Sequence, residues 1–447
     1  MSENQGLRIR ACGGLNGTVL LPGDKSLSHR ALLLASVANG VSRIENCLMA
    51  NVTQAMIDCL RGLGVNIDVL EQASGAAAAA DLVVGGKNLS CFTPPVEPLP
   101  CRGSATTMRL LAGVLAGQPF ESTLDGNERL RMRPMGRLVE PLRSKGALIR
   151  TRQGNAPLTF YPSLLRSSET VLSVASAQVK SALMLAGLFS EGPTSVTEPH
   201  PSRDHTERML RSMGVPVEES FHDDGSHEVR IPGPVTSLPP LDVRLASDPS
   251  SAAFLVVAGL IVPHSAVMIP GICLNPGRTG LFEVLNSMGA LLTVNGQSEM
   301  NGEFVGTVTA STSELRGVLV DGSTVTRMID EFPIFAVAAT QAHGVTTVRD
   351  AAELRLKESD RITALAEELN KMGAGIETSG DGFRVRGPVR LKGARVNGRG
   401  DHRLAMTLAV AGLVAEGETV ITGWEALTDS FPDFPPVLNR LGARLEW

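Results

Sequence analysis

Apolar and polar positions along this chain follow a pattern that recurs six times. In the first half of each repeat, a polar or charged cluster precedes a helix that is apolar on nearly all sides, and a glycine and a strand follow. These segments are 25–40, 106–117, 176–192, 248–259, 330–344 and 401–417. A helix that is apolar all round is a buried helix. Each repeat is therefore predicted to contain one internal helix with polar groups at its N-terminus.

The second half of each repeat contains an amphipathic helix that ends at a short marker. The marker is Leu, Lys or Met, then Gly, then Ala or Val, and an alternating strand follows it. Its six glycines are Gly64, Gly146, Gly214, Gly289, Gly373 and Gly442. Glycine is a favoured residue just after a helix because it adopts positive φ at little cost. The spacing of roughly 70 to 80 residues suits one βαβαββ unit.

Six such units in 447 residues indicate two domains of three units each, because a chain of this length exceeds one compact core. The Pro-rich stretch 232–240, just before the fourth unit, is a candidate hinge. Residues 7–21 lie outside the six units and are expected to pair with the second domain. The predicted domains are 22–244, and a discontinuous domain of 1–21 with 245–447.

Composition narrows the classes of function. The net charge of −5 and a pI near 6.0 argue against a nucleic-acid-binding protein, so any cationic site must be local. No apolar run approaches membrane-spanning length, and residues 1–10 lack the apolar core of a signal peptide. The six cysteines have no metal-site spacing and are expected to be reduced thiols of a cytoplasmic protein.

The start of the first predicted buried helix carries two cations. Lys25 and Arg30 follow Pro22 and Gly23, with Asp24 as a natural N-cap. Free backbone N–H groups and the positive end of the helix dipole point the same way, which favours an anionic ligand there. A solvated helix start with two surface charges explains this stretch equally well.

Polar groups also gather near the starts of four other buried helices. They are Arg102, Ser104, Thr106, Thr107, Arg109, Arg129, Arg131 and Arg133; Ser176, Gln178, Lys180, Arg203, Asp204 and His205; Asp330, Glu331, Arg355, Lys357, Glu358, Asp360 and Arg361; and Asp401, His402 and Arg403. If these helix ends face one cleft, it binds a ligand with several negative charges, and its carboxylates can serve as general acid and base. Scattered caps and ion pairs explain any single cluster, but the recurrence favours a site. Arg102 beside Cys101 could also lower the pKa of that thiol.

Eight motifs in order resemble those of the 5-enolpyruvylshikimate-3-phosphate (EPSP) synthase family, with a closer likeness to its bacterial class II branch. They occupy 25–30, 131–136, 176–182, 203–207, 248–254, 330–333, 356–361 and 401–406. The resemblance covers nearly the whole chain. It implies an α/β fold of two inside-out α/β barrel domains, each of three βαβαββ units around buried helices, with the active site in the interdomain cleft. It also implies transfer of the enolpyruvyl group of phosphoenolpyruvate to the 5-hydroxyl of shikimate 3-phosphate, with release of phosphate and no metal or organic cofactor.

The resemblance also implies roles for single residues. It assigns catalysis to Asp330, Glu358 and Lys25; shikimate 3-phosphate binding to Lys25, Ser26, Arg30, Ser176, Gln178, Arg203, Asp330 and Lys357; and phosphoenolpyruvate binding to Lys25, Ala105, Arg133, Arg361 and Arg403. In these roles Asp330 deprotonates the attacking hydroxyl and Glu358 exchanges a proton at the methylene carbon.

The chain departs from the family pattern in three places, all expected near phosphoenolpyruvate. Residues 102–106 read Arg-Gly-Ser-Ala-Thr where the family usually has Gly-Asn-Ala/Ser-Gly-Thr, so Gly103 and Ala105 replace Asn and Gly. Asn51 stands where an acidic residue is usual, and Asp429 where some members have lysine. The Ala105 methyl predicts reduced sensitivity to glyphosate, which occupies the phosphoenolpyruvate site.

Two alternatives remain at this point. One is an enzyme like UDP-N-acetylglucosamine enolpyruvyl transferase, although that family has Lys-Asn rather than Lys25-Ser26. The other is a low-activity paralogue that binds anions. In all three cases the partners expected are small molecules, with no nucleic acid and no membrane, and the protein is expected to be a monomer.

Overall fold

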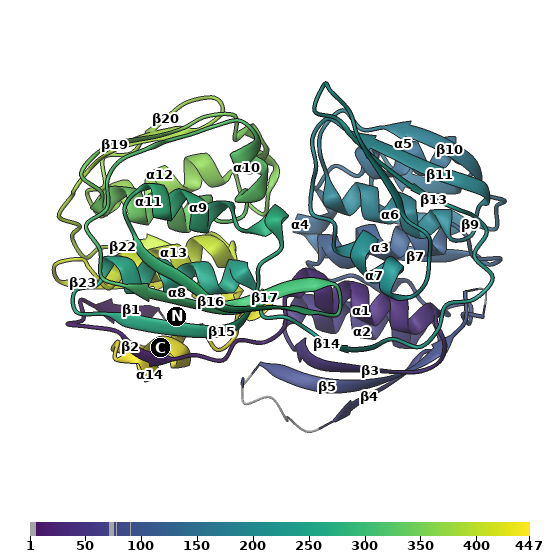
Figure 1. Cartoon of the computed structure of the whole chain (residues 1–447), viewed down its shortest axis with the longest axis horizontal. Helices are drawn as coiled ribbons and strands as arrows, with labels where there is room; N and C mark the ends of the chain where they lie inside the picture. The colour runs from purple at the N-terminus through teal and green to yellow at the C-terminus, as the bar shows by residue number, and fades with distance from the viewer. Residues whose placement is uncertain (1–5, 71–75, 77, 90) are drawn as a thin grey trace. The chain divides into compact units, whose positions relative to one another are not determined.

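A computed structural model describes residues 6–70, 76, 78–89 and 91–447. The chain divides into two compact units (Figure 1). Unit 1 comprises Met1–Leu21, Ser247–Ser298 and Phe304–Trp447, and unit 2 comprises Pro22–Ala246 and Glu299–Glu303. The predicted boundary after residue 244 lies two residues before this division, and the prediction did not group Glu299–Glu303 with unit 2.

In its described residues, unit 2 contains three four-stranded sheets, ordered β14-β3-β5-β4, β6-β7-β9-β8 and β10-β11-β13-β12. Its strands are β3 (Asn39–Leu48), β4 (Asn66–Leu70), β5 (Ala79–Lys87), β6 (Leu99–Pro100), β7 (Ser122–Asp125), β8 (Leu148–Arg152), β9 (Asn155–Tyr161), β10 (Arg166–Val171), β11 (Glu191–Glu198), β12 (Glu218–Phe221), β13 (His227–Ile231) and β14 (Asp242–Arg244). Its helices are α1 (Lys25–Val37), α2 (Asn51–Gly62), α3 (Ala105–Leu115), α4 (Glu128–Arg131), α5 (Gly136–Ser144), α6 (Ala177–Gly187) and α7 (His205–Ser212).

Unit 1 repeats the arrangement with the sheets β16-β17-β15-β2, β18-β19-β21-β20 and β22-β23-β1-β24. Its strands are β1 (Leu7–Arg10), β2 (Asn16–Thr18), β15 (Ala266–Cys273), β16 (Leu291–Met300), β17 (Glu303–Ser311), β18 (Leu319–Val320), β19 (Gly344–Val348), β20 (Glu377–Thr378), β21 (Phe383–Gly387), β22 (Arg395–Asn397), β23 (Glu418–Thr422) and β24 (Leu445–Glu446). Its helices are α8 (Pro249–Ile261), α9 (Gly280–Ser287), α10 (Ser323–Arg327), α11 (Phe332–Gln341), α12 (Arg361–Lys371), α13 (His402–Gly412) and α14 (Phe434–Leu441), with the 3-10 turns η1 (Pro276–Arg278), η2 (Ala352–Leu356) and η3 (Trp424–Asp429).

Each sheet is built in the same way. One edge of each sheet is a parallel pair, as in β6 with β7, β18 with β19 and β2 with β15, and the next strand is antiparallel to that pair. A parallel pair needs a crossover connection, and the buried helices α3 and α11 supply it. Among the described residues the six sheets are open, so the βαβαββ prediction is confirmed without any sheet that closes into a barrel.

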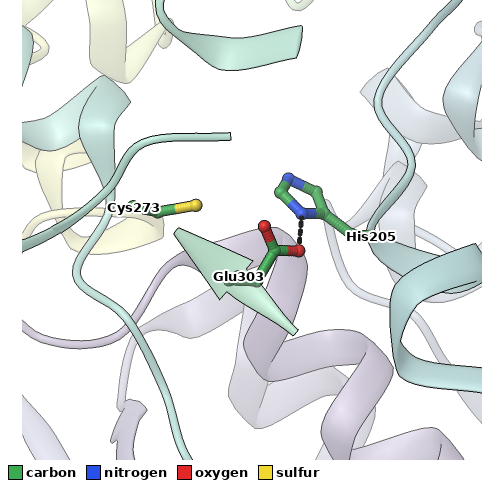
Figure 2. A group of neighbouring side chains, drawn as sticks. All are labelled: His205, Cys273 and Glu303. Carbon is green, nitrogen blue, oxygen red and sulfur yellow. Dashed lines mark hydrogen bonds and ion pairs between the residues drawn. The ribbon is translucent and has the colours of Figure 1, made fainter. Parts of the chain in front are cut away.

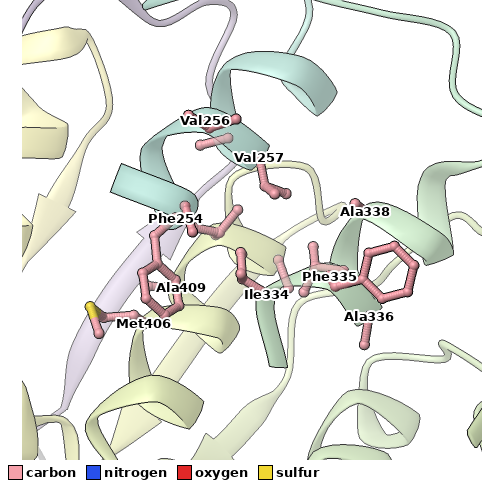
Figure 3. Packing of buried hydrophobic residues seen from close by; sticks show 14 of the residues in the cluster. Phe254, Val256, Val257, Ile334, Phe335, Ala336, Ala338, Met406 and Ala409 are labelled. Atoms are coloured by element: carbon pink, nitrogen blue, oxygen red, sulfur yellow. The ribbon is translucent and has the colours of Figure 1, made fainter. Parts of the chain in front are cut away.

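The six buried helices form the interiors of the two units, as predicted. In unit 1, α8, α11 and α13 pack against one another through residues such as Phe254, Ile334 and Met406 (Figure 3). In unit 2, α3 contacts both α1 and α6. Because these helices are apolar all round, their polar residues are confined to their ends, which places the charged groups at helix starts.

The six marker glycines all adopt the left-handed backbone conformation, as predicted. Their φ angles run from +81° at Gly64 and Gly214 to +117° at Gly442. An L side chain at such a position is strained. These glycines therefore end the outer helices α2, α5, α7, α9, α12 and α14 and turn the chain into the next strand.

Within the part of the chain described here, no helix combines the length and the hydrophobicity required to cross a lipid bilayer.

Candidate active site

In unit 2 the starts of the three buried helices are fixed by side-chain caps. Asp24 Oδ1 accepts from the Leu27 N–H at 2.9 Å, and Ser104 Oγ accepts from the Thr107 N–H at 3.1 Å. Ser176 Oγ makes a longer contact of 3.5 Å with the Val179 N–H. These caps set the first turns of α1, α3 and α6, and those turns carry the predicted ligands Lys25, Ser26, Ala105 and Gln178.

Arg30 connects three elements of unit 2. Its Nε donates to Thr206 Oγ1 at 2.7 Å, its Nη2 to Ser181 Oγ at 2.8 Å and its Nη1 to the Ser26 carbonyl at 3.0 Å. The side chain is buried. Three of its five donors thus hold α1, α6 and α7 together. Arg30, which is predicted to bind substrate, therefore also positions the residues around it.

Gln178 joins the starts of α3 and α6. Its Oε1 accepts from Arg109 Nη1 at 2.6 Å, and its Nε2 donates to Thr106 Oγ1 at 3.0 Å. Ala105, the first residue of α3, is only 7% exposed. Gln178 is predicted to bind shikimate 3-phosphate. Its hydrogen bonds therefore connect a predicted substrate-binding residue to the first turn of α3, where Ala105 differs from the family pattern.

His29 lies beneath this cluster and is fully buried. Its Nδ1 lies 2.7 Å from the Lys25 carbonyl, and its Nε2 lies 3.1 Å from the Val52 carbonyl. Burial lowers the pKa of His29 to about 4, although both carbonyl contacts oppose that shift. His29 is therefore neutral at pH 7 and adds no cation beside Lys25.

Some of the cationic residues predicted near the helix starts form ion pairs with aspartates of the protein. Arg102 pairs with Asp58 of α2, and Arg131 pairs with Asp125. Arg133 is half-buried in the segment between α4 and α5. The expected lowering of the Cys101 pKa is wrong, because burial and the neighbouring Cys59 raise it well above its usual value.

Arg203 lies just before α7 and is half-buried. Two residues later, His205 Nδ1 lies 2.6 Å from Glu303 Oε1 (Figure 2). This contact gives His205 a buried side-chain partner. Glu303 is the first residue of β17, almost a hundred residues further along the chain, and sequence reasoning did not identify it.

In unit 1 Arg361 is the centre of a charged cluster. Its Nε donates to Asp401 Oδ2 at 2.8 Å, its Nη2 to Glu358 Oε2 at 2.7 Å and its Nη1 to Asp330 Oδ1 at 3.4 Å. The structure thus brings together the starts of α11, α12 and α13, together with both predicted catalytic carboxylates.

Asp330 is close to two further cations. Arg403 Nη1 donates to the Asp330 carbonyl at 3.1 Å, and Arg403 Nη2 lies 3.9 Å from Asp330 Oδ2. Lys357 Nζ lies 4.0 Å from Asp330 Oδ1. The side chain of Asp330 is 19% exposed and that of Glu358 is 35% exposed, so both carboxylates remain accessible to a ligand.

The buried side of this cluster is fixed electrostatically. Burial alone would lower the pKa of the Arg361 guanidinium, but the charges of Asp401 and Glu358 outweigh burial and raise it. Burial would likewise raise the pKa of Asp401, but the positive charge of Arg361 lowers it. Asp401 also accepts from the Arg403 N–H at 2.9 Å as the N-cap of α13. Arg361 and Asp401 therefore form a buried ion pair, and Asp401 also fixes the backbone of Arg403 at the start of α13.

Arg278 supports the cluster and was missed from the sequence. Its Nη2 donates to Asp248 Oδ1 at 3.0 Å and to Ser250 Oγ at 2.9 Å, and Ser250 Oγ donates in turn to Glu331. Glu331 Oε1 lies 3.7 Å from Arg403 Nη1. Asp248 and Ser250 belong to a motif that was identified in the sequence. Arg278 follows Pro276-Gly277 and belongs to no recognisable motif, so the sequence did not indicate it.

Nearly the whole chain is similar to known proteins. A family model described as EPSP synthase (3-phosphoshikimate 1-carboxyvinyltransferase) matches residues 9–438. A 3-phosphoshikimate 1-carboxyvinyltransferase from Syntrophomonas wolfei is 46% identical over 96% of this chain and 97% of its own length. The protein of that name from Geobacter metallireducens is 43% identical over 98% of this chain and all of its own length.

Solved structures give the same result. An EPSP synthase from Acinetobacter baumannii has a TM-score of 0.85 and 35% identity, with 99% of both chains covered. The enolpyruvyl transferase NikO from Streptomyces tendae has a TM-score of 0.76, also with 99% of both chains covered. At 22% identity, NikO supports the fold alone.

Proposed function

Because this chain belongs to the EPSP synthase family, we propose that its two groups of charged side chains bind the two substrates of that enzyme. The chain transfers the enolpyruvyl group of phosphoenolpyruvate to the 5-hydroxyl of shikimate 3-phosphate and releases phosphate, a step of the shikimate pathway. This identity argues against the UDP-N-acetylglucosamine alternative.

Shikimate 3-phosphate is assigned mainly to unit 2. Its phosphate is the kind of anion that helix N-termini and cations bind, and the starts of α1 and α6 offer Lys25, Ser26, Ser176 and Gln178. Arg30 and Arg203 add guanidinium groups. From unit 1, Lys357 and Asp330 act on the same molecule, so both units contribute to one reaction.

Phosphoenolpyruvate is assigned to Lys25, Ala105, Arg133, Arg361 and Arg403. The observation that carries this assignment is the pair of guanidinium groups of Arg361 and Arg403 on either side of Asp330. Guanidinium groups match the planar carboxylate and the phosphate of this substrate. The ion pair of Arg361 with Asp401 fixes one of them before the substrate arrives.

The two carboxylates divide the proton transfers between them. Asp330 accepts the proton of the 5-hydroxyl as the hydroxyl oxygen bonds to the second carbon of phosphoenolpyruvate. Glu358 donates a proton to the methylene carbon, which gives a tetrahedral intermediate. When the carbon–phosphate oxygen bond breaks, Glu358 recovers its proton from the methyl group, and the proton held by Asp330 passes to the departing phosphate. The charges of the intermediate are held by cations already in place, which is the arrangement that lowers such barriers. No step is assigned to a metal or an organic cofactor.

Replacing Arg403 with Ala tests the division of the substrates. Loss of a charge-assisted contact typically costs about 1.5–3 kcal/mol, so KM for phosphoenolpyruvate should rise roughly 10- to 100-fold. The Kd of shikimate 3-phosphate alone, measured by calorimetry, should not change. Arg384→Ala, at an exposed position of β21, is the matched control. If Arg403→Ala weakens shikimate 3-phosphate binding and leaves KM for phosphoenolpyruvate unchanged, the assignment is wrong.

We also propose that Ala105 lowers sensitivity to glyphosate. Its methyl group projects into the phosphoenolpyruvate site, where the longer inhibitor has less room than the substrate. At Gly103 an added Cβ would lie 3.2 Å from Asn127 Nδ2, so the side chain that the family usually has there does not fit without movement. The smaller Gly103 therefore gives the loop room to relieve part of the steric effect.

Replacing Ala105 with Gly should make glyphosate a stronger inhibitor. Overpacking typically costs about 1–3 kcal/mol, so the inhibition constant should fall by about 5- to 150-fold. The measurement is glyphosate inhibition against phosphoenolpyruvate, with Ala112→Gly on the same helix as control. Unchanged inhibition in Ala105→Gly would show that the steric account is wrong.

We further propose that the protein acts in the cytoplasm as a monomer. The support for this location is the state of its cysteines, because Cys12, Cys47, Cys59, Cys91, Cys101 and Cys273 all have free thiols.

A further inference from the structure

The loop 199–204 carries Arg203 and is bound by buried carboxylates on both of its sides. Before Arg203 the partner is Glu198, the last residue of β11, and after it the partner is Glu303. Neither residue belongs to the groups assigned above to substrates.

Glu198 holds Ser202, the residue before Arg203. Its Oε1 accepts from the Ser202 N–H at 2.9 Å, and its Oε2 accepts from Ser202 Oγ at 2.6 Å. Lys180 Nζ donates to Glu198 Oε1 at 2.6 Å and to the Ser202 carbonyl at 3.4 Å. The N–H, the hydroxyl and the carbonyl of Ser202 are therefore all bound to this one buried ion pair.

The charges of this ion pair are stable at neutral pH. Burial would raise the pKa of Glu198, but His227 and Lys180 outweigh burial and lower it to about 2. Burial would lower the pKa of Lys180, but Glu207 and Glu198 raise it. His227 lies 3.2 Å from Glu198 Oε1 through Nδ1 and 2.8 Å from Glu219 Oε2 through Nε2. Two salt-bridged cations thus face Glu198 from α6 and β13.

Glu303 and its neighbour hold the other side of the loop. His205 Nδ1 lies 2.6 Å from Glu303 Oε1 (Figure 2). Arg208 donates from Nη1 to the Gly302 carbonyl at 2.8 Å and from Nε to Asp204 Oδ2 at 2.8 Å. Of the two residues after Arg203, His205 therefore contacts Glu303 at the start of β17, and Asp204 is connected through Arg208 to Gly302, the residue before it.

We infer that Glu198 and Glu303 are positioning residues that present Arg203 to the anionic group of shikimate 3-phosphate. The inference rests on the proposed function, in which Arg203 binds this substrate. A long arginine side chain on an unanchored loop loses conformational freedom on binding, whereas a loop fixed on both sides loses less. Buried ion pairs are poor stabilisers compared with apolar packing, so a buried pair that binds the N–H, the hydroxyl and the carbonyl of Ser202 points to orientation of Arg203 rather than to fold stability.

The first test is Glu198→Gln, which retains the size of the side chain and removes its charge. KM for shikimate 3-phosphate should rise about tenfold, because charge-assisted hydrogen bonds to Ser202 are weakened, while KM for phosphoenolpyruvate should not change. Glu219→Gln is the control, since it disturbs His227 without touching Ser202. An equal rise in both variants would overturn the inference, because it would show a general effect of the ion cluster.

Two further variants keep the test decisive. Ser202→Ala removes one hydrogen bond without altering a buried charge, so it should fold and raise the same KM to a smaller extent. Glu303→Gln should act as Glu198→Gln does. If both variants fold and leave the KM for shikimate 3-phosphate unchanged, Arg203 is not positioned in this way.

A double-mutant comparison separates this inference from the proposed function. Arg203→Ala alone should raise KM for shikimate 3-phosphate, and adding Glu198→Gln to it should have no further effect. If Arg203→Ala leaves this KM unchanged, the proposed role of Arg203 fails. If Arg203→Ala raises it and Glu198→Gln raises it equally in both backgrounds, the role of Arg203 holds and the inference fails.

Discussion

Replacing Lys25 with Met is expected to reduce turnover by about 10²- to 10³-fold, the usual cost of removing one preorganised contact to a developing charge. Lys25 is the first residue of α1, where backbone N–H groups and the helix dipole already favour an anion. The cap from Asp24 and the contact of the Lys25 carbonyl with neutral His29 fix this turn. Because Lys25 is assigned to both substrates, its loss affects the step in which they are joined.

The measurement is kcat from phosphate release at saturating concentrations of both substrates, with thermal unfolding to confirm an intact fold. Met retains most of the aliphatic stem of Lys25, so a change in packing is small. Lys392→Met, at an exposed position, is the matched control and should be as active as the unaltered protein. Near-normal turnover in a folded Lys25→Met variant would remove Lys25 from the catalytic residues.

Replacing Asp330 with Asn is expected to lower kcat by about 10²- to 10⁴-fold, the range typical of a lost general base. Asn can still accept from Arg361 and has nearly the same shape, but it cannot take the proton of the 5-hydroxyl. It also removes a negative charge from among Lys357, Arg361 and Arg403. These cations then attract an anion more strongly, so KM for phosphoenolpyruvate should stay constant or fall.

This opposite behaviour of kcat and KM distinguishes a catalytic carboxylate from a structural one. A structural Asp330 would orient Arg361 and Arg403, and its loss would raise KM for phosphoenolpyruvate. Asp321→Asn, at an exposed position of the same unit, serves as control. A variant with normal kcat and a raised KM would assign Asp330 to substrate orientation instead of proton transfer.

Much of the fold could be predicted from the periodicity of apolar residues, because every repeat contains one buried helix and one outer helix that ends at a glycine. An all-apolar helix must be buried, and a marker glycine at positive φ must end the outer helix. Strand partners were harder to predict. Residues 16–18 of β2 pair with residues 266–268 of β15, and the alternating pattern of a strand does not say which distant strand completes its sheet.

The candidate site was predictable to the extent that its residues lie at helix starts. Asp330, Glu358, Arg361 and Arg403 come together because the buried helices α11 and α13 and the outer helix α12 begin at one place. Supporting residues lie elsewhere and have no local signal. Arg278 follows a turn, and Glu198 ends a strand.

Ion-pair partners also determine whether a charged residue can contribute to the site. Arg102 and Arg131 were counted among the cations of the site, but each has an aspartate partner whose position depends on tertiary structure. A sequence pattern shows where charges are placed along the chain. It does not show which of them are neutralised by a residue from another element.

All the residue roles above depend on transfer of enolpyruvyl from phosphoenolpyruvate to shikimate 3-phosphate. The most direct test is phosphate release by the purified protein with phosphoenolpyruvate and either shikimate 3-phosphate or UDP-N-acetylglucosamine as acceptor. We expect continuous release with shikimate 3-phosphate, one phosphate for each enolpyruvyl ether formed, and none with UDP-N-acetylglucosamine. Binding of shikimate 3-phosphate without any release would indicate the anion-binding paralogue, and release with UDP-N-acetylglucosamine would contradict the assignment of the acceptor.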